Sequence, residues 1–119
     1  MRETDPTKAL RLSLIATLLV TLALNLRPAP IARAATITVN NTADTADDDD
    51  GLCTLREAIT AANTGNASGI TAGECAAGSG DDTIDLTGVT GMINLTDSLP
   101  PITSNIVFNG PGESSLTVR

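Results

Sequence analysis

Residues 81–95, DDTIDLTGVTGMINL, contain two short segments with apolar residues at alternate positions. Ile84 and Leu86 form the first apolar pair, and Ile93 and Leu95 form the second. Alternating apolar and polar residues indicate a strand with one buried face. Glycine between the two segments favours a turn. The stretch therefore predicts two short strands.

The same pattern recurs once further along the chain. IDLTG at 84–88 aligns with IVFNG at 106–110, an offset of 22, and Ile93/Leu95 aligns with Leu116/Val118, an offset of 23. A repeat of this length with two short strands is typical of a parallel β-helix, in which stacked coils share one core. A small antiparallel sandwich or meander is the alternative, because its strands recur at about ten-residue spacing.

Residues 35–64 predict a strand followed by a short helix. ATITVNN at 35–41 alternates as a strand does. An apolar stripe at helical spacing, ended by Asn-Thr-Gly at 63–65, is formed by Leu55, Ala58, Ile59 and Ala62. We expect this helix to cover the first strands, because natural proteins protect open sheet ends in this way.

The helix begins with TLRE, residues 54–57. In a capping box, the Thr54 hydroxyl accepts from the Glu57 amide and the Glu57 carboxylate accepts from the Thr54 amide. Glu57 also lies at the positive end of the helix dipole. Arg56 is the only cation near this motif, and we expect it to pair with Asp50 or with an acid beyond the loop.

Four consecutive acids precede the helix, namely Asp47, Asp48, Asp49 and Asp50. Carboxylate oxygens are ligands that calcium prefers, and a calcium loop ends in a glutamate as this segment does at Glu57. Ala46, however, occupies the first ligand position of that pattern. A looser calcium site on the four acids is one hypothesis, and a solvated acidic loop is the alternative. No other cofactor is expected.

Residues 1–34 have the pattern of a signal peptide. Basic residues precede an apolar run at 12–26, which is shorter than the about 20 residues of a membrane span. Ala32-Arg33-Ala34 matches a small-x-small cleavage site. We expect cleavage after Ala34, secretion or display at the cell surface, and no membrane association afterwards. An uncleaved anchor helix is the alternative.

Cleavage leaves a strongly acidic chain. Residues 35–119 contain 12 acids and only two bases, Arg56 and Arg119, which gives a formal net charge of −10. Such a surface repels phosphate backbones, so nucleic-acid binding is excluded as a function class.

The exported part contains the two cysteines of the chain, Cys53 and Cys75. Disulfides persist outside the cytoplasm, and a bridge closing a loop of about 20 residues stabilises a fold by about 3 kcal/mol. Two free buried thiols are the alternative. A zinc site lacks ligands, because the chain has no histidine and no further cysteine.

Residues 35–119 offer little catalytic chemistry. They lack His, Lys, Tyr and Trp, so a general base would be a carboxylate such as Asp81 or Asp82. Phe108 is the only aromatic side chain, whereas sugar sites usually stack rings against their substrate. We assign no catalytic residue, and an enzymatic activity of this chain alone is disfavoured.

CTLREAITAAN at 53–63, with the acidic loop before it and C-x-x-G-S-G-x-D-T-I-x-L after it, resembles the N-terminal CSLREA-type region of secreted bacterial β-helix proteins. LPPITSNIVFNGPG at 99–112 resembles the coil that follows in that family. Thr54 replaces the serine of the family motif and keeps the hydroxyl cap. The resemblance implies an exported right-handed parallel β-helix of the pectate-lyase-like class, without implying lyase activity.

Together these observations predict an all-β fold, the start of a right-handed parallel β-helix with a short N-terminal capping helix. Residues 35–80 would form the strand, acidic loop, cap helix and disulfide loop, and residues 81–119 the first coils, with further coils or self-association covering the C-terminal edge. The expected role is structural or adhesive, toward a surface polysaccharide or protein partner. The alternative is the N-terminal part of a polysaccharide-active lyase or hydrolase whose catalytic coils lie beyond residue 119.

Overall fold

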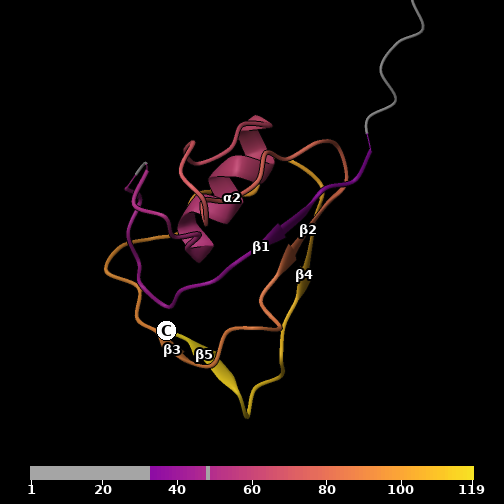
Figure 1. Ribbon diagram of the computed structural model, residues 1–119. Helices are drawn as coiled ribbons and strands as arrows, with labels where there is room; N and C mark the ends of the chain where they lie inside the picture. Colours follow the sequence, from indigo (N-terminus) through magenta and orange to yellow (C-terminus); the bar gives the residue numbers. More distant parts are fainter. Residues whose placement is uncertain (1–32, 48) are drawn as a thin grey trace, which may run out of the picture. The chain divides into compact units, whose positions relative to one another are not determined.

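The computed structural model describes residues 33–47 and 49–119. The elements in this part of the chain, labelled as in Figure 1, are β1 (Thr36–Thr38), α2 (Leu55–Thr64), β2 (Asp82–Asp85), β3 (Gly91–Ile93), β4 (Ile106–Asn109) and β5 (Leu116–Val118). The predicted signal peptide lies outside it, apart from residues 33 and 34. Among the helices of the described residues, none has the length and apolar character needed to cross a membrane.

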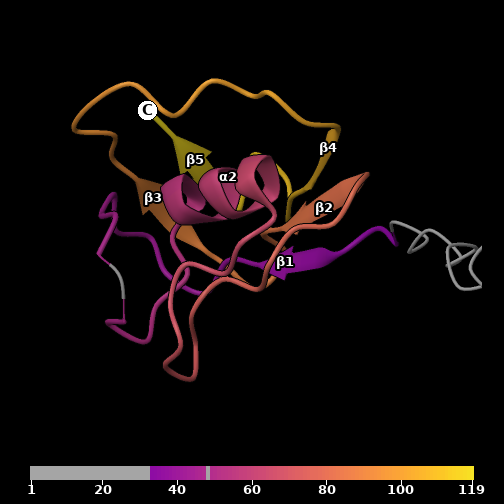
Figure 2. The same ribbon diagram turned by 90° about the horizontal axis from the view of Figure 1, so that it is seen from above.

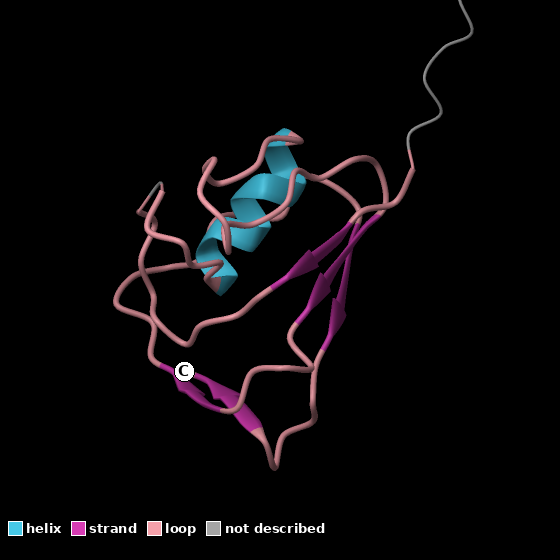
Figure 3. Cartoon of the chain, viewed as in Figure 1, coloured by secondary structure: helices cyan, strands magenta, loops and turns pink. Residues whose placement is uncertain are grey.

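The strands form two small parallel sheets. One has the order β1-β2-β4, and the other pairs β3 with β5 (Figure 3). All three strand pairs of the described residues are parallel. The helix α2 packs against β1 and β2. Figure 2 shows the three-stranded sheet to the right of the helix, and in Figure 1 the β3–β5 pair lies below the helix.

The predicted fold class is wrong. The described residues contain a ten-residue helix and strands of three or four residues in two sheets of unequal size, and they show no β-helix solenoid. Residues 81–119, expected to be the first coils, supply four strands to these two sheets. The physical reason is that the strand pair occurs only twice. Between β1 and β2 the chain forms a helix and loops, so β1 has no counterpart in the β3–β5 sheet.

The register of the repeat also differs from the prediction. Ile84 lies beside Phe108, and Ile93 lies beside Val118. Both offsets are two residues longer than the sequence alignment gave. Because side chains alternate between the faces of a strand, a shift of two residues keeps apolar residues on the same face. The sequence pattern thus identified the buried faces without fixing the register.

The helix α2 has the boundaries that its sequence predicts. Thr54 is the N-cap, and both hydrogen bonds of the capping box to Glu57 are present. Gly65 ends the helix in the left-handed conformation, φ 70°, and its amide donates to the Ala61 carbonyl. Glycine adopts this conformation without the steric cost that a β-carbon brings.

The core contains apolar side chains of neighbouring strands that lie side by side. Ile37 of β1, Ile84 of β2 and Phe108 of β4 are aligned across the three-stranded sheet. Ile37 and Ile84 are 0% exposed, whereas Phe108, on the last strand, is 45% exposed. In the second sheet Ile93 is 0% exposed and its neighbour Val118 is 44% exposed. The apolar side chains of β4 and β5 are therefore only partly shielded from solvent.

This burial predicts which isoleucine matters for stability. Ile93→Ala should lower the free energy of unfolding by about 2–5 kcal/mol, because it leaves a cavity in the covered core. Ile102→Ala, at a loop position that is 55% exposed, should change it by less than about 0.5 kcal/mol. Chemical denaturation of the two variants measures both values, and equal losses would contradict the burial pattern.

Candidate functional site

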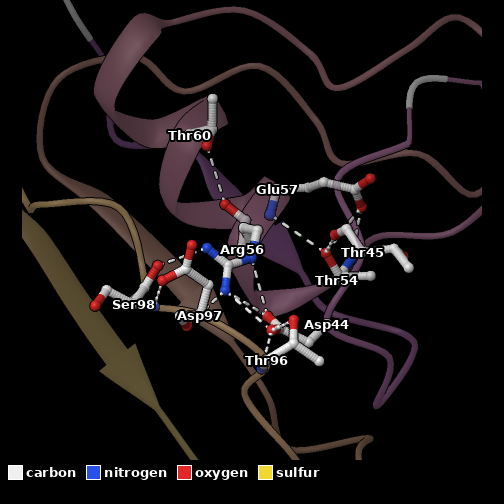
Figure 4. A network of polar contacts seen from close by, with 9 residues as sticks. All are labelled: Asp44, Thr45, Thr54, Arg56, Glu57, Thr60, Thr96, Asp97 and Ser98. Carbon is white, nitrogen blue, oxygen red and sulfur yellow. Dashed lines mark hydrogen bonds and ion pairs between the residues drawn. The ribbon is translucent and has the colours of Figure 1, made fainter.

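Arg56 connects three separate segments of the chain (Figure 4). From the first turn of α2, its Nε and Nη2 donate to Oδ1 and Oδ2 of Asp44 at 2.9 and 3.0 Å. Its Nη1 donates to the Ser98 carbonyl at 2.7 Å, and Nη2 also donates to the Asp97 carbonyl at 2.9 Å. The planar guanidinium suits this arrangement, because its donors form a rigid fork. Arg56 thereby fixes the loop after β3 to the helix.

Arg56 pairs with Asp44, inside the acidic loop, and not with Asp50 or an acid beyond the loop, which are the partners expected from the sequence. The Asp44 side chain is only 3% exposed. Its Oδ2 also accepts from the amide and hydroxyl of Thr96, at 2.6 and 2.8 Å. The Thr96 amide, with the Thr96 hydroxyl and Arg56, holds the pKa of Asp44 below its ordinary value, against an opposing effect of burial.

The capping box is extended to the acidic loop. Glu57, 4% exposed, accepts from the Thr54 amide through Oε2 and from the Asp47 amide through Oε1, each at 2.9 Å. The buried Thr54 hydroxyl donates to the Thr45 carbonyl at 2.7 Å. The two cap side chains therefore hold both the first turn of the helix and the loop before it.

Two further acids of the loop bind backbone amides. Asp49 accepts from the amides of Ile70 and Thr71, at 2.5 and 3.2 Å, and its own φ is 69°. Asp50 accepts from the Leu52 amide at 2.8 Å. Asp48 lies outside the described residues. These contacts use the carboxylates of Asp49 and Asp50 to position loops.

The described residues bring no three or more His, Cys, Asp or Glu side chains together in a way that could hold a metal ion. Of the four acids proposed to bind calcium, Asp47 and Asp50 are exposed, and Asp49 binds the loop at 70–71. Glu57 is engaged in the capping box. The calcium hypothesis therefore stays a prediction from the sequence.

Cys53 and Cys75 form a disulfide, as the sequence predicts, with 4.7 Å between their Cα atoms. Both are buried next to the helix start. Ser68 strengthens the connection, because its amide donates to the Cys75 carbonyl and its hydroxyl accepts from the Cys75 amide, at 3.1 and 2.8 Å. The bridge fixes the loop between α2 and β2.

Asp81 and Asp82, the carboxylates considered for catalysis, have different environments. Asp81 is exposed and accepts from the Asn105 side chain at 2.7 Å. Asp82 is 0% exposed, and its Oδ1 accepts from the amides of Ala35 and Ser79 at 3.0 and 2.8 Å. A β-carbon on Gly78 would lie 2.5 Å from its Oδ2, which explains a glycine there. Asp82 thus positions β1 beside β2.

A cavity of about 260 Å³ lies between α2 and the loop that follows it. Glu57, Thr60 and Asn66 line it together with small side chains. Since the Glu57 carboxylate, the one charged group among the lining residues, already accepts from the Thr54 and Asp47 amides, the cavity carries no free charged group from the helix.

The C-terminal edge that the sequence predicts to need cover is formed by strands β4 and β5, defined here as the outer layer. Each is the last strand of its sheet, and Val107, Phe108 and Val118 are 63%, 45% and 44% exposed. Between Asp97 and Arg119 the only charged residue is Glu113. That absence of charge is the sequence signal of the layer, because strands at a sheet edge usually carry charges that prevent pairing.

Comparison with protein-family models, with curated proteins and with solved structures found no match for this chain. The resemblance to CSLREA-type regions therefore stays a prediction that rests on the sequence motif.

The capping contacts predict a specific loss of stability. Thr54→Ala should lower the free energy of unfolding by about 0.5–2 kcal/mol, because the helix loses its N-cap acceptor. Thr54→Ser should keep most of it. Thr60→Ala, which removes an exposed hydroxyl in the same helix, is the matched control and should cost less. Urea denaturation compares the three variants, and a Thr60→Ala loss as large as that of Thr54→Ala would contradict the cap.

The pKa of Asp44 predicts a pH dependence. Its pKa is lower in the folded chain, so its stabilisation is fully present above the ordinary carboxyl pKa of about 4 and is lost as pH falls through the lower, folded value. Asp44→Asn should thus lower the Tm at pH 7, with a difference from wild type that shrinks below pH 4. Asp47→Asn, in the same loop, controls for the removed charge. A difference that stays constant to pH 2 would contradict this role.

Proposed function

We propose that this chain is an exported structural module with an adhesive role, which attaches further β-structure to its outer layer. One observation carries the proposal. The apolar residues that are fully covered on β2 and β3 have partly exposed counterparts on β4 and β5. A sheet edge with free backbone groups and an apolar surface is a surface suited to strand addition.

Contacts elsewhere in the described residues support the proposal that the rest of the module holds the outer layer in position. The disulfide, the capping box and the Arg56 contacts hold the helix, the acidic loop and the loop after β3 together. Many polar side chains of the described residues bind backbone groups and thereby hold loops in position. Such an arrangement suits a rigid base that presents the outer layer.

The disulfide between Cys53 and Cys75 fits a location outside the cytoplasm, where such bonds persist. The predicted signal peptide with cleavage after Ala34 agrees with this location and completes the proposal of secretion or surface display. The enzyme alternative, a polysaccharide lyase or hydrolase with catalytic groups beyond residue 119, has no specific support among the contacts of the described residues.

Binding to washed producer cells, whose surface proteins can supply a strand, tests the adhesive role. Labelled exported protein should be retained, and Val107→Lys, on the free strand β4, should reduce retention several-fold. Thr36→Lys is the matched control, because Thr36, Thr83 and Val107 share one register position and Thr36 lies on the strand at the other side of the sheet. Equal retention of wild type and Val107→Lys would overturn the proposal.

A further inference from the structure

We propose that a second copy of this chain pairs with the outer layer, through antiparallel contact of β4 with β4 about a two-fold axis at Val107. The inference rests on the proposed function, because it names the partner of the same surface. A two-fold arrangement uses one patch twice, so it requires a patch that is complementary to itself. The backbone, the side chains and the charges of β4 each meet this requirement.

The backbone groups of β4 divide between its two edges. The carbonyls of Asn105 and Asn109 accept from amides of the β2 segment, at 2.9 and 2.7 Å. Since alternate residues of a strand face opposite neighbours, the N–H and C=O groups of Ile106 and Phe108 face the free edge. Placing Val107 opposite Val107 of a second copy sets Ile106 opposite Phe108 in both directions. All these free groups then gain partners.

The side chains at this edge need cover. Phe108 continues the buried row of Ile37 and Ile84 but remains 45% exposed, and Val107 on the other face is 63% exposed. In the proposed pair, Phe108 of each copy lies against Ile106 of the other. The contact thus removes apolar surface from water on both copies, which is the main favourable contribution to association.

Charge selects this edge for contact between like molecules. Residues 35–119 have a formal net charge of −10, so two copies repel each other over most of their surface. The outer strands themselves are uncharged. Asp81, which directly precedes β2, and the half-buried Asp85 within β2 accept hydrogen bonds from the Asn105 and Asn109 side chains, at 2.7 and 3.2 Å. Strand β4 therefore adds no charge repulsion of its own to a contact between two copies.

These charges also predict the effect of salt. Association of two acidic copies through a neutral edge should strengthen as salt screens their repulsion. Attachment of a basic partner to the acidic surface would weaken with salt instead. The direction of the salt effect therefore distinguishes a second copy from a charged partner.

Sedimentation of the full-length exported protein over two decades of concentration tests the inference. We expect a reversible dimer that is favoured by 0.5 M over 0.05 M NaCl. Val107→Lys should raise the dimer dissociation constant by about tenfold or more, because it sets two like charges opposite each other. Thr36→Lys carries the same charge change on β1 and should leave the constant within about twofold. Thermal unfolding verifies that both variants fold.

A covalent readout fixes the symmetry. Val107→Cys should form an intermolecular disulfide with itself in high yield, because directly opposed residues of antiparallel strands lie within disulfide reach. Thr36→Cys is the control and should not. A chain that stays monomeric at every concentration and salt overturns the inference, while loss of surface binding by Val107→Lys would still support the proposed function. Dimers broken equally by Thr36→Lys indicate head-to-tail pairing of β1 with β4 and also overturn it.

Discussion

The apolar side chains of each short strand are shielded from water by the strand beside it. The stability of the fold depends on this packing. Ile37, Ile84 and Phe108 stand in register, and burial is complete for the first two and incomplete for the third. Strands of three or four residues bury too little alone to be stable, so each needs a neighbour. Among the described residues, strands β4 and β5 have no neighbouring strand on their outer side, so they are available for a further partner.

Contacts outside the strands add stability that the short strands alone do not provide. The helix α2 covers the interior side of β1 and β2, and its capping box binds the acidic loop. Arg56 also connects the helix to the loop after β3, because it donates to the Asp97 and Ser98 carbonyls. The disulfide closes the loop between α2 and β2. Each contact joins segments distant in sequence, which suits a small domain whose core gives limited stability.

Local patterns predicted local structure well. The capping box, the helix end at Gly65 and the bridge between Cys53 and Cys75 follow from short motifs or from the presence of only two cysteines. These features depend on interactions that neighbouring residues or covalent chemistry fix. The alternation of apolar residues likewise indicated the buried faces of β2 and β3.

Features set by tertiary contact were harder to derive. Two copies of a strand pair cannot distinguish two small sheets from a continuing solenoid, and face alternation leaves shifts of two residues undetermined. The choice of Asp44 by Arg56 depends on Thr96, which only the fold brings near. Asp82 is buried, and its Oδ1 accepts hydrogen bonds from the amides of Ala35 and Ser79, a pairing that no spacing in the sequence reveals.

Amide hydrogen exchange of single residues in β4, measured on dilute protein, tests the central claim of a free outer edge most directly. We expect protection of the Val107 and Asn109 amides, which face β2, and fast exchange of the Ile106 and Phe108 amides, which face the free edge. Slow exchange of Ile106 and Phe108 in the dilute monomer would mean that this edge is already covered, and would contradict the account.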